Sequence, residues 1–197
     1  MADDVQICNM GLARIQGEPI ASLEPDEEGK AAALCRTLYV PLRDAVLRHH
    51  DWAWAAKRQV LSLLGAGSAY LSSYLYVYQL PADPYCLRPL VLLDCADDYQ
   101  ELDVPFEVEG RTLFTNLAAA GLKYTARITD PALFDDLFID ALAWRLAANM
   151  LRPLEGNSEA DPWAMYLASI TKAVGRDEVG KQQKETPPER WVERRFG

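Results

Sequence analysis

The sequence is poor in histidine. Its 197 residues include only two, His49 and His50, which are adjacent. A serine or cysteine nucleophile needs a neighbouring base, usually a histidine, so only this place could supply one. Side chains that are adjacent in sequence point in different directions on a helix or a strand. The pair therefore cannot hold one metal ion without an irregular backbone.

The segment LRHHDWAWAAKRQ (residues 47–59) places Asp51 directly after the two histidines and Trp52 and Trp54 just beyond. It has two interpretations, a small active site built on His49 or His50 with Asp51, or the end of a helix. We favour the helix end, because cations stabilise the C-terminal end of a helix. The two tryptophans would then anchor the following chain in the core.

Cysteine is scarce, and no two of the four cysteines have the CxxC spacing typical of structural zinc sites. All four lie among apolar neighbours, which predicts buried thiols in a reducing compartment. The sequence thus predicts no metal and no cofactor. The four are Cys8, Cys35, Cys86 and Cys95.

The sequence also lacks long apolar runs and an excess of basic residues. No run of 18 apolar residues predicts a membrane span, and the acidic start MADDVQICNM predicts no signal peptide. Lys and Arg number 20 against 29 Asp and Glu, a net charge of −9, which argues against tight nucleic-acid binding. No phosphate-loop or dinucleotide motif occurs, and GAGS at 65–68 reads as a turn.

Acidic residues gather in DCADDYQELD, residues 94–103. Carboxylates this dense could bind a hard cation or transfer protons. The spacing does not fit an EF-hand, however, so a solvated loop is the default interpretation. The residues concerned are Asp94, Asp97, Asp98, Glu101 and Asp103.

Apolar residues at helical spacing predict four helices. The first covers residues 3–17. The second begins near Asp26 and contains Pro41, which should kink it. The third and fourth follow Asp130-Pro131 and Asp161-Pro162, where Asp can cap the helix and Pro can occupy its first position. The third should bury a face listed as Leu133, Phe134, Leu137, Ala141, Leu142 and Ala148.

The middle of the chain has strand patterns instead. Alternating residues predict strands at 74–80, 86–93 and 122–128, and a hairpin at 103–116 with Glu109-Gly110 at its turn. Pro89 argues for an edge strand or a bulge. Together these patterns predict an α+β fold, an antiparallel helix bundle with an inserted antiparallel β lobe and an extended C-terminal tail. The predicted parts are a helical domain (1–50 and 129–176), a β-rich lobe (51–128) and an extended arm (177–197).

The last 17 residues, KQQKETPPERWVERRFG, have no apolar period and cannot build a core. Aromatic residues beside arginines are typical of interface anchors. We therefore predict a docking arm for another protein, with a disordered end whose Trp191 folds back as the alternative. The predicted docking residues are Arg190, Trp191, Arg194, Arg195 and Phe196.

The order of several segments resembles the tail tubular protein A family of podovirus-type phages, which are head-to-tail adaptors. The segments are NMGLARIQGEPIASL, RTLYVPLRDAVLRHHDWAWAAKR, YVYQLPADPYCLRP, EGRTLFTN and LKYTARITDPALFDDLFIDALAWRLAANM. The resemblance covers roughly residues 5–175.

This resemblance implies a structural protein of the virion, assembled in the host cytoplasm and without catalysis. Such adaptors form a closed ring, commonly of about twelve copies, between the portal and the tail nozzle. They retain the DNA and let it pass through the lumen during ejection. The implied partners are the portal protein, a tail tubular protein B-like nozzle protein and further copies of the chain. The portal contact would fall to the C-terminal arm.

Two other functions stay open from the sequence. One is a small soluble enzyme that uses His49 or His50 with nearby carboxylates. The other is a monomeric binding module whose basic tail recruits an acidic partner.

Overall fold

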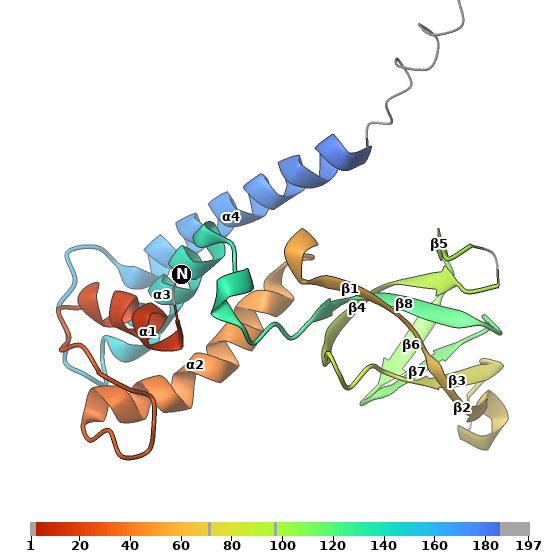
Figure 1. Cartoon of the computed structure of the whole chain (residues 1–197), viewed down its shortest axis with the longest axis horizontal. Helices are drawn as coiled ribbons and strands as arrows, with labels where there is room; N and C mark the ends of the chain where they lie inside the picture. The colour runs from red at the N-terminus through yellow and green to blue at the C-terminus, as the bar shows by residue number, and fades with distance from the viewer. Residues whose placement is uncertain (1–2, 71, 97, 186–197) are drawn as a thin grey trace, which may run out of the picture. The chain divides into compact units, whose positions relative to one another are not determined.

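The structure is a computed structural model, and it describes residues 3–70, 72–96 and 98–185. Its fold is mixed α+β, with four α-helices and two antiparallel sheets in the described residues (Figure 1). The chain divides into two compact units. The helical unit consists of Ala2–Leu42 and Phe134–Gly197, and the strand unit is Arg43–Leu133. The division falls inside the second helix, so its last residues belong to the strand unit.

Helix α1 (Asp4–Ala13) starts with a capping box. The Asp3 carboxylate accepts a hydrogen bond from the Gln6 backbone N–H at 2.7 Å, and the Gln6 side chain accepts one from the Asp3 N–H at 3.2 Å. Each bond satisfies a backbone donor that has no partner within the helix. The helix packs against α3 (Asp136–Met150). Gly11 allows the close approach, since a Cβ there would lie 3.0 Å from the Leu146 Cβ.

Helix α2 (Lys30–His49) begins four residues later than the sequence pattern predicts. Asp26 and its acidic neighbours lie before the helix, and Gly29, at a φ of +118°, separates them from it. A left-handed φ interrupts helical geometry, so the helix cannot extend back to Asp26. Pro41 lies inside α2, as predicted.

The starts of the last two helices differ in whether the predicted aspartate caps the helix. Asp161 caps α4 (Pro162–Glu185) as predicted, with its carboxylate accepting a hydrogen bond from the Trp163 N–H at 3.1 Å. Asp130 does not cap α3. It caps the short 3-10 turn η3 (Pro131–Leu133), and Asp135 caps α3 by accepting from the Leu137 N–H at 2.9 Å. Leu133 is consequently exposed, and its predicted place in the core is wrong.

The predicted extended arm is also wrong in its first part. Helix α4 continues to Glu185, so residues 177–185 are helical. An ion pair between Asp177 and Lys181, 2.8 Å apart at an i, i+4 spacing, supports this last stretch. The rest of the predicted arm lies outside the described residues. None of the helices within 3–185 is long and apolar enough to cross a membrane.

Asp140 ties three helices of the helical unit together. Its carboxylate forms an ion pair at 2.5 Å with Arg14, the residue directly after α1, and accepts a hydrogen bond from the Ser169 hydroxyl of α4 at 2.7 Å. The Arg14 guanidinium also lies 4.2 Å from the centre of the Trp144 ring. The core beneath is apolar, and its largest fully buried side chains are Ile7, Leu12, Ile15, Tyr39, Phe138 and Leu142.

The strand unit holds two four-stranded antiparallel sheets, ordered β1-β8-β4-β5 and β2-β3-β7-β6. Gly110, at a φ of +58°, begins the two-residue turn of the β6–β7 hairpin, one position after the predicted start. Core residues include Val77, Leu92, Leu113, Leu122 and Tyr124. The strands are β1 (Ala56–Val60), β2 (Ser62–Ala66), β3 (Tyr76–Gln79), β4 (Cys86–Asp94), β5 (Gln100–Leu102), β6 (Phe106–Glu109), β7 (Thr112–Thr115) and β8 (Ala120–Ala126).

Pro89 lies where the sequence pattern predicts, beside an irregularity. The register of β4 against β8 shifts between Pro89 and Val91, and β5 pairs only with Leu92–Asp94. Proline has no N–H to donate, so it is tolerated where one side of the strand has no neighbour.

The order of strands gives the unit two distinct edges. β1 and β2, separated only by Leu61, form one edge of the two sheets, and we call residues 56–66 the β1–β2 edge. β5 and β6 form the opposite edge of both sheets, and we call residues 100–109 the β5–β6 edge. Each edge is thus built by one short continuous segment of the chain.

Candidate functional site

The histidines close helix α2, as predicted. His49 is the last residue of α2, with Arg48 also in its final turn, and His50 follows. The His50 ring packs edge-on against the Trp52 ring, with their centroids 5.0 Å apart. The helix dipole favours a cation such as Arg48 in the last turn. The packing of His50 against Trp52 gives the pair a structural place.

Trp52 anchors the chain that leaves the helix. Its side chain is 1% exposed, and its indole N–H donates a hydrogen bond to the Val46 carbonyl oxygen at 3.2 Å. Its ring lies 6.1 Å from that of Trp54. A 3-10 turn, η1 (Ala53–Ala55), then leads into β1. The sequence prediction of a tryptophan anchor is confirmed for Trp52.

Asp51 forms an ion pair that the sequence did not indicate. Its carboxylate lies 2.8 Å from Nη2 of Arg88 on β4. The same guanidinium donates a hydrogen bond through Nη1 to the Arg48 carbonyl oxygen at 3.2 Å. Arg88 therefore ties the end of α2 to the sheet. The ion pair with Arg88 also gives Asp51 a structural role.

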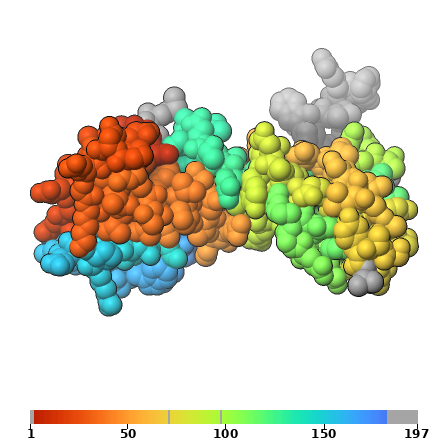
Figure 2. Space-filling model, turned by 90° about the horizontal axis from the view of Figure 1, so that it is seen from below, coloured from red at the N-terminus to blue at the C-terminus, as the bar shows by residue number. Residues whose placement is uncertain are grey.

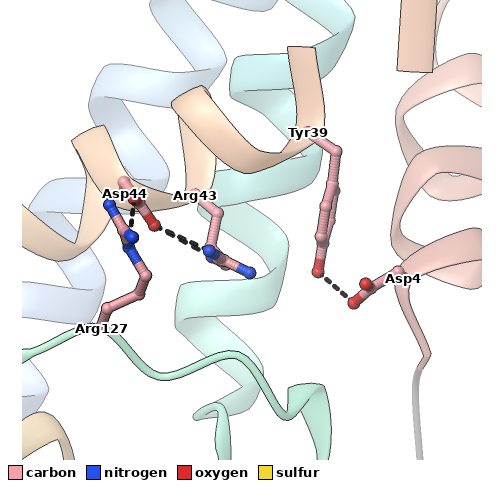
Figure 3. Close-up of polar contacts among 5 residues, drawn as sticks. All are labelled: Asp4, Tyr39, Arg43, Asp44 and Arg127. Atoms are coloured by element: carbon pink, nitrogen blue, oxygen red, sulfur yellow. Dashed lines mark hydrogen bonds and ion pairs between the residues drawn. The ribbon is translucent and has the colours of Figure 1, made fainter. Parts of the chain in front are cut away.

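A more buried charge cluster surrounds Asp44 in α2 (Figure 3). Its carboxylate Oδ1 accepts hydrogen bonds from Nε and Nη2 of Arg43 at 3.1 and 2.9 Å, and its Oδ2 lies 2.7 Å from Nε of Arg127. Arg43 is only 4% exposed. One carboxylate thus pairs with two guanidinium groups. The sequence analysis missed this cluster, although charged residues within the apolar stripe of a helix were a signal for it.

Figure 3 also shows a second polar contact, within the helical unit. The Tyr39 hydroxyl donates a hydrogen bond to the Asp4 carboxylate at 2.6 Å, which joins α2 to the first turn of α1. Tyr39 is almost fully buried. Burial of the ring leaves the hydroxyl in need of a polar partner, and Asp4 supplies it.

Tyr85 lies between two arginines in the strand unit. The guanidinium of Arg111 is 4.0 Å from the ring centre and that of Arg127 is 4.3 Å from it. Arg111 also donates hydrogen bonds to the carbonyl oxygens of Leu80, Pro81 and Cys86. These contacts fix the segment between β3 and β4.

A cavity of about 390 Å³ opens beside this segment. Side chains of both charges line it, and none of the lining residues is histidine, cysteine or serine. It can accept a small polar or charged group. The lining residues are Lys57, Ala82, Asp83, Pro84, Tyr85, Arg127, Ile128, Thr129, Asp130 and Leu133.

In the acidic stretch, Asp98, Glu101 and Asp103 are exposed and Asp94 is partly buried, while Asp97 lies outside the described residues. Glu101 accepts hydrogen bonds from Lys123 Nζ at 2.7 Å and Arg58 Nη2 at 2.8 Å. The hydrogen bond from Lys123 contributes most to lowering the pKa of the Glu101 carboxyl, and the bond from Arg58 lowers it further. Among the residues that can be placed, no group of three or more His, Cys, Asp or Glu could hold a metal ion.

Three of the four cysteines are buried as predicted, and all four are free thiols. Burial raises the pKa of Cys86 to about 11. Cys95 is the exception because it is only partly buried. It lies directly after β4, where the strand ends and its neighbours become exposed.

Large apolar side chains are exposed along the β1–β2 edge. Val60 is 57% exposed, Leu63 56% and Leu64 44%. In Figure 2 the orange-to-yellow atoms of this segment, residues 56–66, lie on the visible surface of the strand unit. Grouped apolar side chains on a surface mark contact sites, whereas single ones do not. The sequence analysis missed this edge because it predicted no strand at residues 56–66.

The predicted docking residues lie outside the described residues. They are Arg190, Trp191, Arg194, Arg195 and Phe196, and their role stays a prediction. No protein-family model and no curated protein matches the chain. The function is therefore argued from the chain's own residues.

Proposed function

We propose that the protein is a structural head-to-tail adaptor of a phage virion. In this proposal about twelve copies form a closed ring between the portal and the tail nozzle. The ring completes the head, retains the packaged DNA and lets it pass during ejection. The order of segments that resembles the tail tubular protein A family supports this proposal.

The observation that carries it is the exposed apolar edge of the strand unit. Val60, Leu63 and Leu64 are each about half exposed to solvent. A chain of this size can bury most of its apolar residues, so a group left exposed indicates a surface that another molecule covers. An adaptor has such surfaces because it contacts itself and two other proteins.

The charge of the chain agrees with the passage of DNA. The net charge of the chain is −9. Tight phosphate contacts would hold the genome in place, whereas an acidic surface repels it and lets it slide. The proposal therefore assigns the protein no specific DNA contact.

The portal contact is assigned to the C-terminal segment, through Trp191, Phe196 and the arginines beside them. The structure describes helix α4 as far as Glu185. Deletion of residues 186–197 therefore removes this segment and keeps every described residue of α4. It is a sharper test than removal of the last 17 residues, which would cut into the helix.

The test uses the portal protein encoded in the same genome. Purified full-length chain and the chain lacking residues 186–197 are each mixed with portal rings and imaged by negative-stain electron microscopy. We expect an added ring below the portal with the full chain and none with the shortened chain. Circular dichroism should show the same unfolding transition for both chains.

Two results would contradict the proposal in different ways. A full chain that stays monomeric and leaves the portal bare would overturn the adaptor function. A shortened chain that still attaches would overturn only the assigned arm. A matched variant, Trp191→Ala with Phe196→Ala in the full chain, separates loss of the aromatic anchors from loss of length.

A further inference from the structure

The two edges of the strand unit differ in charge. The β1–β2 edge, AKRQVLSLLGA, contains Lys57 and Arg58 and no acidic residue. The β5–β6 edge, QELDVPFEVE, contains four acidic residues and no basic residue. The four are Glu101, Asp103, Glu107 and Glu109.

Part of this charge is used within the chain. Arg58 and Glu101 pair with each other at 2.8 Å, and Glu101 also pairs with Lys123. What remains is Lys57 on one edge and three carboxylates on the other. The edges therefore stay opposite in sign after the internal pairs are removed.

Both edges also present apolar side chains. On the β1–β2 edge these are Val60, Leu63 and Leu64, and on the β5–β6 edge Val108 is 40% exposed. The register shift between Leu63 and Gly65 leaves Leu64 as an additional residue on β2. Such a bulge widens the apolar surface there and weakens simple strand addition. The contact these edges favour is side-chain packing, flanked by charges.

We propose that the β1–β2 edge of one copy packs against the β5–β6 edge of the next copy. Val60, Leu63 and Leu64 cover Val108, and Lys57 lies among the carboxylates of the neighbouring copy. The occupant is a second copy because the chain itself carries both complementary surfaces. Contact between two identical edges is disfavoured, since two β5–β6 edges would bring like charges together.

The contact is head-to-tail, because each copy uses one edge for the copy before it and the other for the copy after it. Such heterologous contacts produce a ring when the rotation closes and a filament when it does not. The inference deepens the proposed function by naming the surface through which copies meet, and it rests on that function for the closure of the ring.

Cysteine cross-linking tests the pairing of the edges. Leu63→Cys and Val108→Cys are made in separate full-length chains, one of which carries a tag that changes its mass. The chains are mixed, oxidised mildly and separated under denaturing conditions. We expect dimers of mixed mass from the mixture and monomers from each variant alone. The double variant should give a ladder of dimers, trimers and higher species.

The matched control replaces Leu63→Cys with Leu133→Cys, because Leu133 is 59% exposed in the same unit but lies off both edges. The control mixture should give no more cross-link than the wild-type chain. Cross-linked dimers of Leu63→Cys alone, or control dimers as abundant as mixed ones, would overturn the pairing.

A second measurement distinguishes failure of the edge pairing from failure of the proposed function. Leu63→Asp should weaken self-association in sedimentation velocity by roughly tenfold or more, with an unchanged circular dichroism spectrum. If rings form on the portal without any edge cross-link, the edge pairing is wrong and the adaptor function stands. If the chain neither self-associates nor joins the portal, both are wrong.

Discussion

The indole nitrogen of Trp52 lies 3.2 Å from the carbonyl oxygen of Val46, six residues earlier in the chain. This bond holds the exit from α2 in a fixed path, and the Trp52 ring is almost fully buried. Trp52→Ala should lower the free energy of unfolding by about 3 kcal/mol or more, because it leaves a cavity and an unsatisfied carbonyl. Urea denaturation measures the change.

His50→Ala is the matched comparison for this prediction. The His50 side chain is only partly buried against the edge of Trp52, so its loss should cost about 1 kcal/mol or less. A larger loss of stability from His50→Ala than from Trp52→Ala would contradict this prediction and reopen the interpretation of the histidine pair as an active site.

The second prediction concerns Asp44. Asp44→Ala leaves the buried guanidinium of Arg43 and the partly buried one of Arg127 without their shared carboxylate. An uncompensated buried charge is costly, so the free energy of unfolding should fall by about 3 kcal/mol. Arg58→Ala removes an exposed ion pair and should cost less than about 1 kcal/mol. Equal effects in urea denaturation would contradict the distinction.

The third prediction is a pH dependence at Glu101. Its folded pKa is lowered by Lys123 and Arg58. The stabilisation is therefore fully present above the unfolded pKa, roughly 4.3, and is lost as the pH falls through the lower folded value. The stability difference between the wild type and Glu101→Gln should shrink across that window. A constant difference between pH values on either side of it would argue against the ion pairs.

The fourth prediction concerns thiol reactivity. The pKa of Cys86 is about 11 because the thiol is buried, so near pH 8 only on the order of one thiol in a thousand is ionised. Iodoacetamide labelling followed by mass spectrometry should modify Cys95 well before Cys86 in the folded protein. In denaturant all four cysteines should react alike. Rapid labelling of Cys86 in the folded chain would contradict its burial.

Much of the secondary structure follows from local signals. Asp161-Pro162 predicts the start of α4, because the Asp161 side chain caps the helix and the Pro162 ring fixes its own φ at a helical value. Both effects act within one turn. Gly110 marks the β6–β7 turn because a positive φ is easy for glycine. The predicted docking residues beyond Glu185 lie outside the described residues, so the structure does not test that prediction.

Where two local signals compete, the sequence does not choose. Asp130 and Asp135 are both good caps, five residues apart, and the structure uses Asp135 for α3 and Asp130 for η3. The choice depends on which residues then face the core: Phe138 is fully buried and Leu133 is exposed. Packing of the helix against its neighbours decides this, and packing is not a local property.

The sequence by itself determined that the described residues contain four helices and most of the strands between residues 74 and 128, as well as the acidic charge and the scarcity of histidine. Each of these depends on spacing or composition along the chain. Only the tertiary structure decided that Asp44 pairs with Arg127 and that residues 56–66 and 100–109 form opposite edges of the same sheets. Contacts between distant residues depend on how all the elements pack at once. Many pairings satisfy the local pattern, and burial of the whole core selects one of them.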